Sequence, residues 1–436
     1  MSRAIRVTLY PLILLPAALS LLYVYSFGVS VVYEEQWDVV PLFGKLASGE
    51  LSIADLWVQY NEHRMLFPTG VELLLGGITK YDNVAEMYFI QVCFLTTLGI
   101  LLLAFKQSIR TTLLFFIPIS FMVFSLRQAM NMLFGFQINF ALTQTFGVLS
   151  LFLLYVLGHS SLKKLAFVAA LGSGTVASFT IAQGLLVWPV GVLQLVISPV
   201  EKSTKKAMIV VWGLIGLGVW VAYFVDYVKP EDHPTLFYVF EHPLVGAQYF
   251  VTLLGGSLFS EQEPVFALLS SGLLLIGCAI AGLLLAYRDR KLGENSFWIA
   301  LFSYASLGLV SITLGRAGLG IEGAVASRYV AFSILAVIGV YAILVKLASE
   351  KKSYLTRALL GLLTLTILTS IPLSYSYGIK KGIHNEAQKE KAAYVLATYK
   401  SQSDERLKSN LHANEAHIRA HAPLLERLGY NVFSEP

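Results

Sequence analysis

Residues 328–347 read RYVAFSILAVIGVYAILVKL, with only two charged side chains, Arg328 at one end and Lys346 near the other. The stretch has about the 20 residues that a helix needs to cross the apolar core of a bilayer. A helix that is apolar on every side is buried in a large protein or lies within a membrane. The stretch therefore predicts a spanning helix with a cation towards each end.

Similar stretches occur along most of the chain. Of the 436 residues, 56% are hydrophobic and 14% are charged, whereas soluble domains carry about 25% charged residues. This composition excludes a soluble enzyme with a single anchor, a disordered protein and a disulfide-stapled module. The sequence predicts an all-α polytopic membrane protein with about 11 transmembrane helices. They are expected approximately at residues 9–32, 84–105, 111–126, 138–157, 165–181, 184–199, 207–228, 264–287, 295–315, 328–347 and 355–376.

The charges between these spans predict the side on which each loop lies. With a cytoplasmic N-terminus, the inner loops carry sixteen basic and four acidic residues, and the outer side before the tail carries seven basic residues. Basic residues prefer cytoplasmic loops. We therefore expect an integral inner (plasma) membrane protein with a cytoplasmic N-terminus and a periplasmic, or extracytoplasmic, C-terminus. These loop positions account for the net charge of +5, so the charge does not indicate nucleic-acid binding.

Two outer segments are longer than simple connectors. Residues 33–83 follow the first span and contain Trp37 and Trp57, which is typical of amphipathic helices at a membrane interface. Residues 379–436 are rich in charge and predict a small helical tail. We therefore divide the chain into a transmembrane domain over residues 1–378 and a periplasmic C-terminal tail. A short Gly-rich apolar stretch, 244–260, predicts an interfacial or re-entrant helix.

The first outer loop opens on an acidic cluster that contains Glu34, Glu35 and Asp38. Three carboxylates within five residues repel one another, and partial burial by lipid adds to this effect. Both effects raise a carboxyl pKa, which suits a general base. Glu35 or Asp38 is the candidate base, with Glu34 as a third candidate. The alternative is a hydrated loop that keeps the segment out of the bilayer.

The same loop then places Glu62, His63 and Arg64 directly before an apolar helix. Together they offer a proton carrier and a fixed cation, and we take them as candidate substrate-binding residues. Glu62 would be compatible with the positive end of a helix dipole. The alternative is that the segment only anchors the helix that follows.

Two arginines lie in the Gly-rich region between the ninth and tenth predicted spans, Arg316 and Arg328, the second followed by Tyr329. Arginine at membrane depth is costly and is usually paired or functional. Its planar fork of donors suits phosphate oxygens, so we predict a phosphate site at these three residues. Ser327 is expected to cap the tenth helix. The alternatives are snorkelling to the interface or a salt bridge from Arg316 to Glu322.

These motifs resemble those of the GT-C membrane glycosyltransferases. In that family an acidic motif in the first extracytoplasmic loop is followed by a histidine–proline–leucine turn. Glu35-Gln36-Trp37-Asp38 is similar to the first motif, and His63-Arg64-Met65-Leu66 with Pro68 resembles the second, although no strict Asp-Glu pair or His-Pro-Pro-Leu turn occurs. The segment around Arg316 and Arg328 looks like the late phosphate-binding element of such proteins.

The resemblance implies an inverting glycosyltransferase. It would move a sugar from a polyprenyl-phosphate donor to an acceptor hydroxyl on a surface glycan or lipid, at the periplasmic face. Glu35 or Asp38 would take the acceptor proton, and Arg316 and Arg328 would hold the phosphate. A divalent cation is compatible with carboxylates near phosphate, but the arginines could neutralise the charge without one. The sequence has no zinc pattern; His417 and His421 have metal-compatible spacing, but surface histidines at helical spacing are commoner than metal sites.

Two other functions are compatible with the sequence. In a transporter or lipid flippase, the arginines and carboxylates would bind or couple the substrate, but the inverted repeats typical of such proteins are not seen. In a noncatalytic membrane scaffold, the outer loop and the tail would hold partner proteins.

Overall fold

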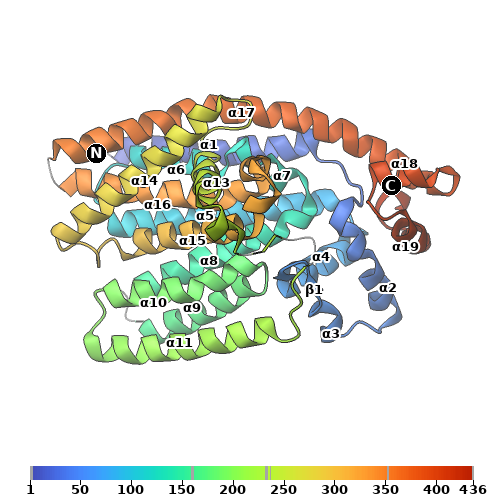
Figure 1. The fold of residues 1–436 in the computed structure, drawn as a ribbon, viewed down its shortest axis with the longest axis horizontal. Coiled ribbons are helices and arrows are strands. Elements are labelled where there is room, and N and C mark those ends of the chain that lie inside the picture. Colours follow the sequence, from blue (N-terminus) through green and yellow to red (C-terminus); the bar gives the residue numbers. More distant parts are fainter. Residues whose placement is uncertain (1–2, 159–161, 231–233, 236, 351–352, 435–436) are drawn as a thin grey trace.

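The computed structural model of the chain describes residues 3–158, 162–230, 234–235, 237–350 and 353–434. Its long helices run side by side along one direction (Figure 1). They are α1 (Arg3–Phe27), α5 (Asn83–Ser108), α8 (Ile138–Val156), α11 (Lys202–Phe224), α14 (Val265–Arg288), α15 (Ser296–Arg316), α16 (Val330–Glu350) and α17 (Tyr354–Ala397). Shorter helices join them: α6 (Ile117–Val123), α7 (Ala129–Leu133), α9 (Lys163–Ser178), α10 (Val187–Ile197), α12 (Tyr238–Glu241) and α13 (Pro243–Gly255).

The predicted all-α, multi-pass membrane architecture is confirmed, but the count of 11 spans is not. Every predicted span overlaps a helix, although the spans 9–32 and 207–228 extend past the ends of α1 and α11. Within the described residues, nine helical segments are long and apolar enough to cross a membrane. The predicted spans 165–181 and 184–199 correspond to α9 and α10, which have 16 and 11 residues. Both are shorter than the roughly 20 residues that a full crossing needs.

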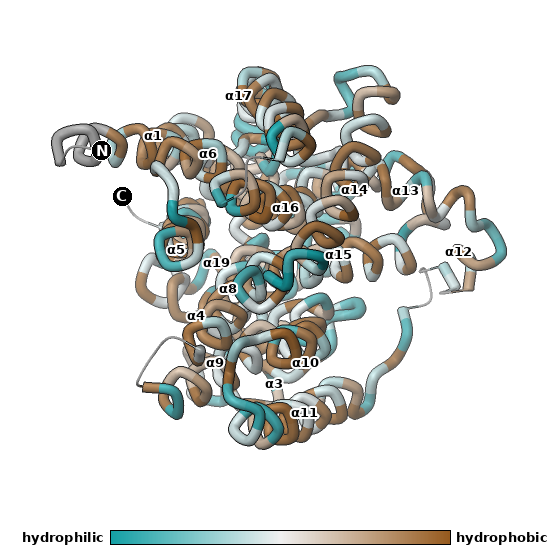
Figure 2. Tube along the Cα trace, turned by 90° about the vertical axis from the view of Figure 1, so that its left-hand side faces the viewer, coloured by the Kyte–Doolittle hydropathy of each residue, from teal (hydrophilic) through white to brown (hydrophobic). Residues whose placement is uncertain are grey.

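The stretch that opens with Arg328 lies at the centre of the bundle. Every residue in the most apolar window of α16 is buried inside the protein, compared with 28% for α11 and for α17. Viewed along the helices, α8, α15 and α16 lie inside, and α11 and α17 lie at opposite edges (Figure 2). A glycine lets α15 approach α16 closely, because a Cβ on Gly339 would meet the carbonyl oxygen of Trp298 at 3.0 Å.

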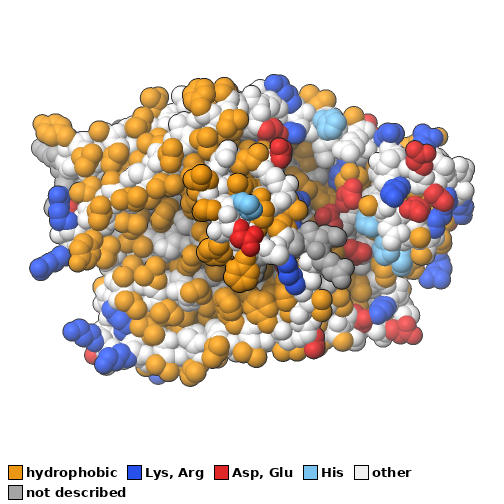
Figure 3. Space-filling model, viewed as in Figure 1, with side chains coloured by type: hydrophobic (Ala, Val, Ile, Leu, Met, Phe, Trp, Pro, Cys, Tyr) orange, Lys and Arg blue, Asp and Glu red, His pale blue; other side chains and the backbone are white. Residues whose placement is uncertain are grey.

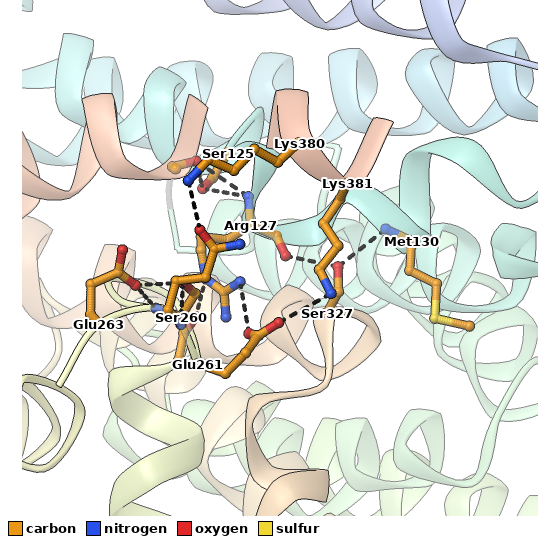
Figure 4. A network of polar contacts seen from close by, with 12 residues as sticks. Ser125, Arg127, Met130, Ser260, Glu261, Glu263, Ser327, Lys380 and Lys381 are labelled. Carbon is orange, nitrogen blue, oxygen red and sulfur yellow. Dashed lines mark hydrogen bonds and ion pairs between the residues drawn. The ribbon is translucent and has the colours of Figure 1, made fainter. Parts of the chain in front are cut away.

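The predicted interfacial or re-entrant stretch 244–260 contains α13. This helix has 13 residues and is too short to span. It packs against α14, where Gly255 allows close approach: a Cβ there would lie 2.1 Å from the carbonyl oxygen of Leu268. The turn after α13 leads to residues 260–264, which lie beside α17 (Figure 4).

The first outer loop is more compact than two interfacial helices. It contains a 3₁₀ turn, η1 (Glu34–Asp38), three helices and a two-stranded hairpin. These elements are α2 (Val40–Ser48), α3 (Ile53–Leu56), β1 (Gln59–Tyr60), β2 (His63–Arg64) and α4 (Leu66–Thr79). The hairpin was not predicted. Its turn places Asn61 at a φ of 48°, a conformation that Asn tolerates better than most residues.

The C-terminal tail packs on the first loop. The helix α17 continues without a break through residue 378, where we placed the start of the tail, and it is followed by α18 (Asp404–Asn410) and α19 (Glu415–Leu428). Trp37 and Phe43 of the loop share a hydrophobic cluster with Ile418 and Leu425 of the tail. The loop and the tail therefore form one cap at one end of the bundle, opposite the start of α1 (Figure 1).

The surface agrees with a bundle that crosses a membrane. Hydrophobic side chains cover the flank of the long helices, and charged side chains gather at the two ends (Figure 3). Lys and Arg dominate the end where α1 begins, whereas both signs of charge occur at the end that carries the cap.

Candidate active site

The turn η1 holds its residues on two opposite sides. Gln36 and Trp37 are fully buried. The Gln36 Nε2 donates to Glu86 Oε2 over 2.8 Å, and the Tyr81 hydroxyl donates to the Gln36 carbonyl over 3.2 Å. Because these two residues face the protein, their neighbours Glu34 and Glu35 face the other way, into open space.

That space consists of two cavities. The first, cavity A, has a volume of about 720 Å³ and lies between the first loop, α7, the segment before α16 and the outer part of α17. The second, cavity B, has a volume of about 520 Å³ and lies between the hairpin, the start of α8 and the end of α15. Glu35 and Arg328 line both cavities. A carboxylate and a guanidinium therefore stand where the two cavities meet.

Arg328 belongs to a 3₁₀ turn, η8 (Ser327–Tyr329), that leads into α16. Its guanidinium carbon lies 5.1 Å from the centre of the Tyr329 ring, and its carbonyl oxygen accepts from Asn131 Nδ2 over 3.2 Å. Among the described residues, the structure shows no carboxylate in salt-bridge contact with this guanidinium. Arg328 is therefore a half-buried cation that faces a cavity and is available to an anion.

Ser327 does not cap the tenth span as predicted. Its hydroxyl donates to the Arg127 carbonyl over 2.8 Å and accepts from the Met130 N–H over 3.1 Å. The serine thus ties the η8 turn to α7, and this tie fixes the position of the neighbouring Arg328.

Arg316 also lines cavity B, but it has an internal counter-ion. Its Nη2 lies 2.5 Å from Glu62 Oε1, and the two side chains are 20% and 24% exposed. In the part of the chain that the structure describes, Arg316 forms a salt bridge with Glu62 and none with the Glu322 considered from the sequence. His63 lies beside them, where its Nδ1 accepts from the Ala182 N–H over 3.2 Å and its Nε2 is 3.9 Å from Glu62 Oε1. All three of these predicted binding residues line cavity B, as does Tyr329.

Two predicted site residues lie away from both cavities. Arg64 is buried, and it donates to the carbonyls of Trp57, Tyr223 and Val225, so it fastens the hairpin to the end of α11 and is a structural residue. Asp38 is exposed on the other side of η1, 3.5 Å from His417 Nε2 of the tail. Of these two carboxylates, Glu35 lines both cavities and Asp38 lines neither.

Glu34 lines cavity A only. Burial, and then the charge of Glu35, raise the pKa of the Glu34 carboxyl above its usual value. Burial likewise raises the pKa of the neighbouring Tyr33 hydroxyl to about 12. Glu34 therefore holds a proton beside Glu35 at a higher pH than an ordinary carboxyl does.

Several polar residues near the cavities were missed or misread in the sequence. Lys389 lies in the charge-rich tail that the sequence predicts to be helical, yet it is buried, with its Nζ 4.8 Å and 4.5 Å from the ring centres of Tyr33 and Phe134. Glu86 is buried within a predicted span and anchors Gln36. An ionisable residue inside a span is a functional candidate by default, and this signal could have identified Glu86.

The described residues contain no group of three or more His, Cys, Asp or Glu side chains placed to hold a metal ion. The ring centres of His417 and His421 in the tail lie 4.4 Å apart with the rings tilted by 49°, and His421 Nδ1 contacts the His417 carbonyl.

Comparison with known proteins gives few matches. No protein-family model matches the chain. A stretch of 210 residues, 44% of this chain, is 27% identical to an uncharacterized protein of Archaeoglobus fulgidus and covers 52% of that protein. The chain thus spans about half the length of the relative that it matches.

Two solved structures share part of the architecture. ArnT from Cupriavidus metallidurans, bound to undecaprenyl phosphate, is 14% identical with a TM-score of 0.46, over 95% of this chain and 88% of ArnT. The oligosaccharyltransferase of A. fulgidus, tethered to an acceptor peptide, is 13% identical with a TM-score of 0.45, over 91% of this chain and 58% of that protein. Both are GT-C glycosyltransferases, the family that the sequence motifs resemble. Because both TM-scores are below 0.5, the proposed function rests on the geometry of this chain's own residues.

Proposed function

We propose that the protein is an inverting membrane glycosyltransferase of the GT-C type. It takes a sugar from a polyprenyl-phosphate donor and transfers it to an acceptor hydroxyl of a glycan or lipid on the periplasmic side of the membrane. The observation that carries this proposal is the position of Glu35 and Arg328, which line both cavities. The N-terminus is cytoplasmic in this proposal, and the cap faces outward.

The reaction needs a base and a cation on opposite sides of the sugar. Glu35 takes the proton of the acceptor hydroxyl, and the acceptor oxygen bonds to the anomeric carbon. The bond from that carbon to the donor phosphate breaks on the opposite face, and its electron pair stays on the phosphate. Arg328 stabilises the charge that develops there, as a preorganised donor does in other group transfers. The phosphate is already a good leaving group, so no second carboxyl is required as an acid.

Cavity B suits the donor. Its aromatic walls include Phe136, Phe140 and Phe224, which can contact a polyprenyl chain, while Arg316 and Arg328 lie close to the phosphate. Glu62 forms a salt bridge with Arg316, so a phosphate competes with that carboxylate for the cation. Cavity A then receives the acceptor from the aqueous side.

The proposal predicts a large loss of transfer in the Glu35→Gln variant, because the amide cannot accept the hydroxyl proton. General-base catalysis typically contributes about 10²–10⁴-fold. The assay incubates membranes containing the protein with a panel of radiolabelled polyprenyl-phosphate sugars and counts label in the acceptor fraction.

Asp38→Asn is the matched control, since this carboxylate lies on the same turn but away from both cavities. Its transfer rate should remain near that of the wild type. Equal rates for Glu35→Gln and the wild type with an active donor would reject Glu35 as the base. Energy-dependent lipid movement without transfer would favour the transporter instead.

A further inference from the structure

Arg127 is a buried cation whose hydrogen-bonding capacity is mostly unused. It belongs to the 3₁₀ turn η3 (Leu126–Gln128), and its side chain is 1% exposed. Its Nε donates to the Gly256 carbonyl over 3.1 Å, and its guanidinium lies 4.2 Å from the centre of the Tyr377 ring. Both Nη atoms are buried, and within the described residues neither has a hydrogen-bond partner. Such a charge is costly to bury unless something pairs with it.

One carboxylate lies between this guanidinium and cavity A. Glu261, in the turn between α13 and α14, places Oε2 3.8 Å from Arg127 Nη1 and Oε1 3.2 Å from Lys381 Nζ (Figure 4). Glu261, Lys381 and Tyr377 all line cavity A. The glutamate is 39% exposed, so it can turn outward into water. The carboxylate therefore occupies a position between two cations at the cavity wall.

The neighbouring Glu263 does not share this role. Its Oε2 accepts from the N–H and from the hydroxyl of Ser260, so it closes the turn (Figure 4). The two carboxylates of one turn thus differ: one is tied to its own backbone, and the other bridges two cations from distant parts of the chain.

We propose that Glu261 occupies a second phosphate subsite, and that a phosphate group of the substrate displaces it to bind Arg127 and Lys381. This inference rests on the proposed function, because it adds a phosphate to the one assigned to Arg328. A phosphate offers three oxygens to the guanidinium fork and the ammonium, and it would give the Nη atoms the hydrogen bonds they lack. The same cavity is lined by two further cations, Arg328 and Lys389, as well as by Glu34, Glu35 and Glu322.

The second phosphate has two sources that share this chemistry. A diphosphate donor would carry it beside the first, and a phosphorylated acceptor would bring it separately. Three probes separate them: undecaprenyl phosphate, undecaprenyl diphosphate and glucose 1-phosphate. Their dissociation constants are measured on the full chain in detergent micelles, which does not require transfer activity.

Glu261→Gln should tighten binding of undecaprenyl diphosphate or of glucose 1-phosphate by about tenfold, because the competing charge is removed. Adding Arg127→Gln, or Lys381→Gln if the arginine variant does not fold, should cancel the gain. Glu263→Gln changes the charge of the same turn equally and should leave the constants unchanged.

A gain for the diphosphate assigns the subsite to the donor, and a gain for glucose 1-phosphate assigns it to the acceptor. The inference is overturned if Glu261→Gln binds all three probes no more tightly than the wild type, which would indicate a structural salt bridge. It is also overturned if Glu263→Gln gives the same gain, which would indicate a general charge effect. A failure of the proposed transfer shows separately, in the labelled-sugar assay of the Glu35→Gln variant, and leaves these constants unaffected.

Discussion

Replacing Arg328 with glutamine should remove most of the transfer activity and little of the stability. The variant loses the guanidinium at the junction of the two cavities. Removing one preorganised donor from a site of developing charge costs about 10²–10³-fold in rate, or roughly 3–4 kcal/mol. The described structure shows no salt bridge to this side chain, so the substitution does not deprive any carboxylate there of a salt-bridge partner. The free energy of unfolding should therefore change by less than about 1 kcal/mol.

Arg316→Gln is the matched comparison, since both arginines line cavity B. Its guanidinium is already in contact with Glu62 at 2.5 Å, and both side chains are mostly buried. The substitution takes this cation from the Glu62 carboxylate, which should lower the free energy of unfolding by about 1–3 kcal/mol. The loss of transfer should be smaller than for Arg328→Gln, because Glu62 already offsets part of the charge of Arg316.

Two measurements on each variant separate the effects. Single-turnover transfer from the labelled donor gives the rate of the chemical step, and thermal unfolding in detergent gives the stability. We expect Arg328→Gln to transfer slowly with a nearly unchanged melting temperature. We expect Arg316→Gln to transfer faster than Arg328→Gln but to have a lower melting temperature. Transfer by Arg328→Gln within threefold of the wild type would refute the role of this guanidinium, and so would a reversed order of the two variants.

Two further predictions concern the turn that carries Glu35. The raised pKa of Glu34 means that the native state holds this proton more tightly than the unfolded chain, so stability should fall as pH rises from about 4.5 through the raised pKa. Glu34→Gln should flatten that part of a plot of melting temperature against pH, and an unchanged slope would contradict the assignment. A Cβ on Gly135 would lie 1.8 Å from Glu86 Oε2, so Gly135→Ala should displace Glu86 from Gln36 and cost about 1–3 kcal/mol. Transfer should fall with it, whereas Gly99→Ala, with open space around the Cβ, should lower neither the melting temperature nor transfer.

The sequence predicted the membrane architecture because composition alone decides it. A helix such as α16 has no polar face to show to water, so burial in a bundle within the membrane follows from its residues. The number of crossings was harder to predict. The helices α9 and α10 consist mostly of apolar residues but have only 16 and 11 residues, and apolar content does not reveal where a helix ends.

The site was partly predictable because of the geometry of membrane bundles. The loops that leave one face of the bilayer come together at one end of the bundle, so Glu35, His63 and Arg316 could be placed together from the order of spans alone. Sequence could not tell which side of a turn each residue faces. Glu35 and Asp38 differ by three positions in one 3₁₀ turn, yet one lines both cavities and the other contacts the tail.

The tail was the least predictable part of the site. Its charge density indicates a helix in water, yet Lys389 is buried against two aromatic rings. A lysine can bury its stem and ammonium when aromatic faces and nearby carboxylates replace water. One of the two rings, Tyr33, comes from the first loop and the other, Phe134, follows α7, and both are more than 250 residues away in the sequence. Because α17 extends beyond the apolar part of the bundle, it supplies one wall of cavity A. The tail is therefore a component of the site. Its removal should alter the binding of the molecule that enters cavity A more than it alters the binding of the donor in cavity B.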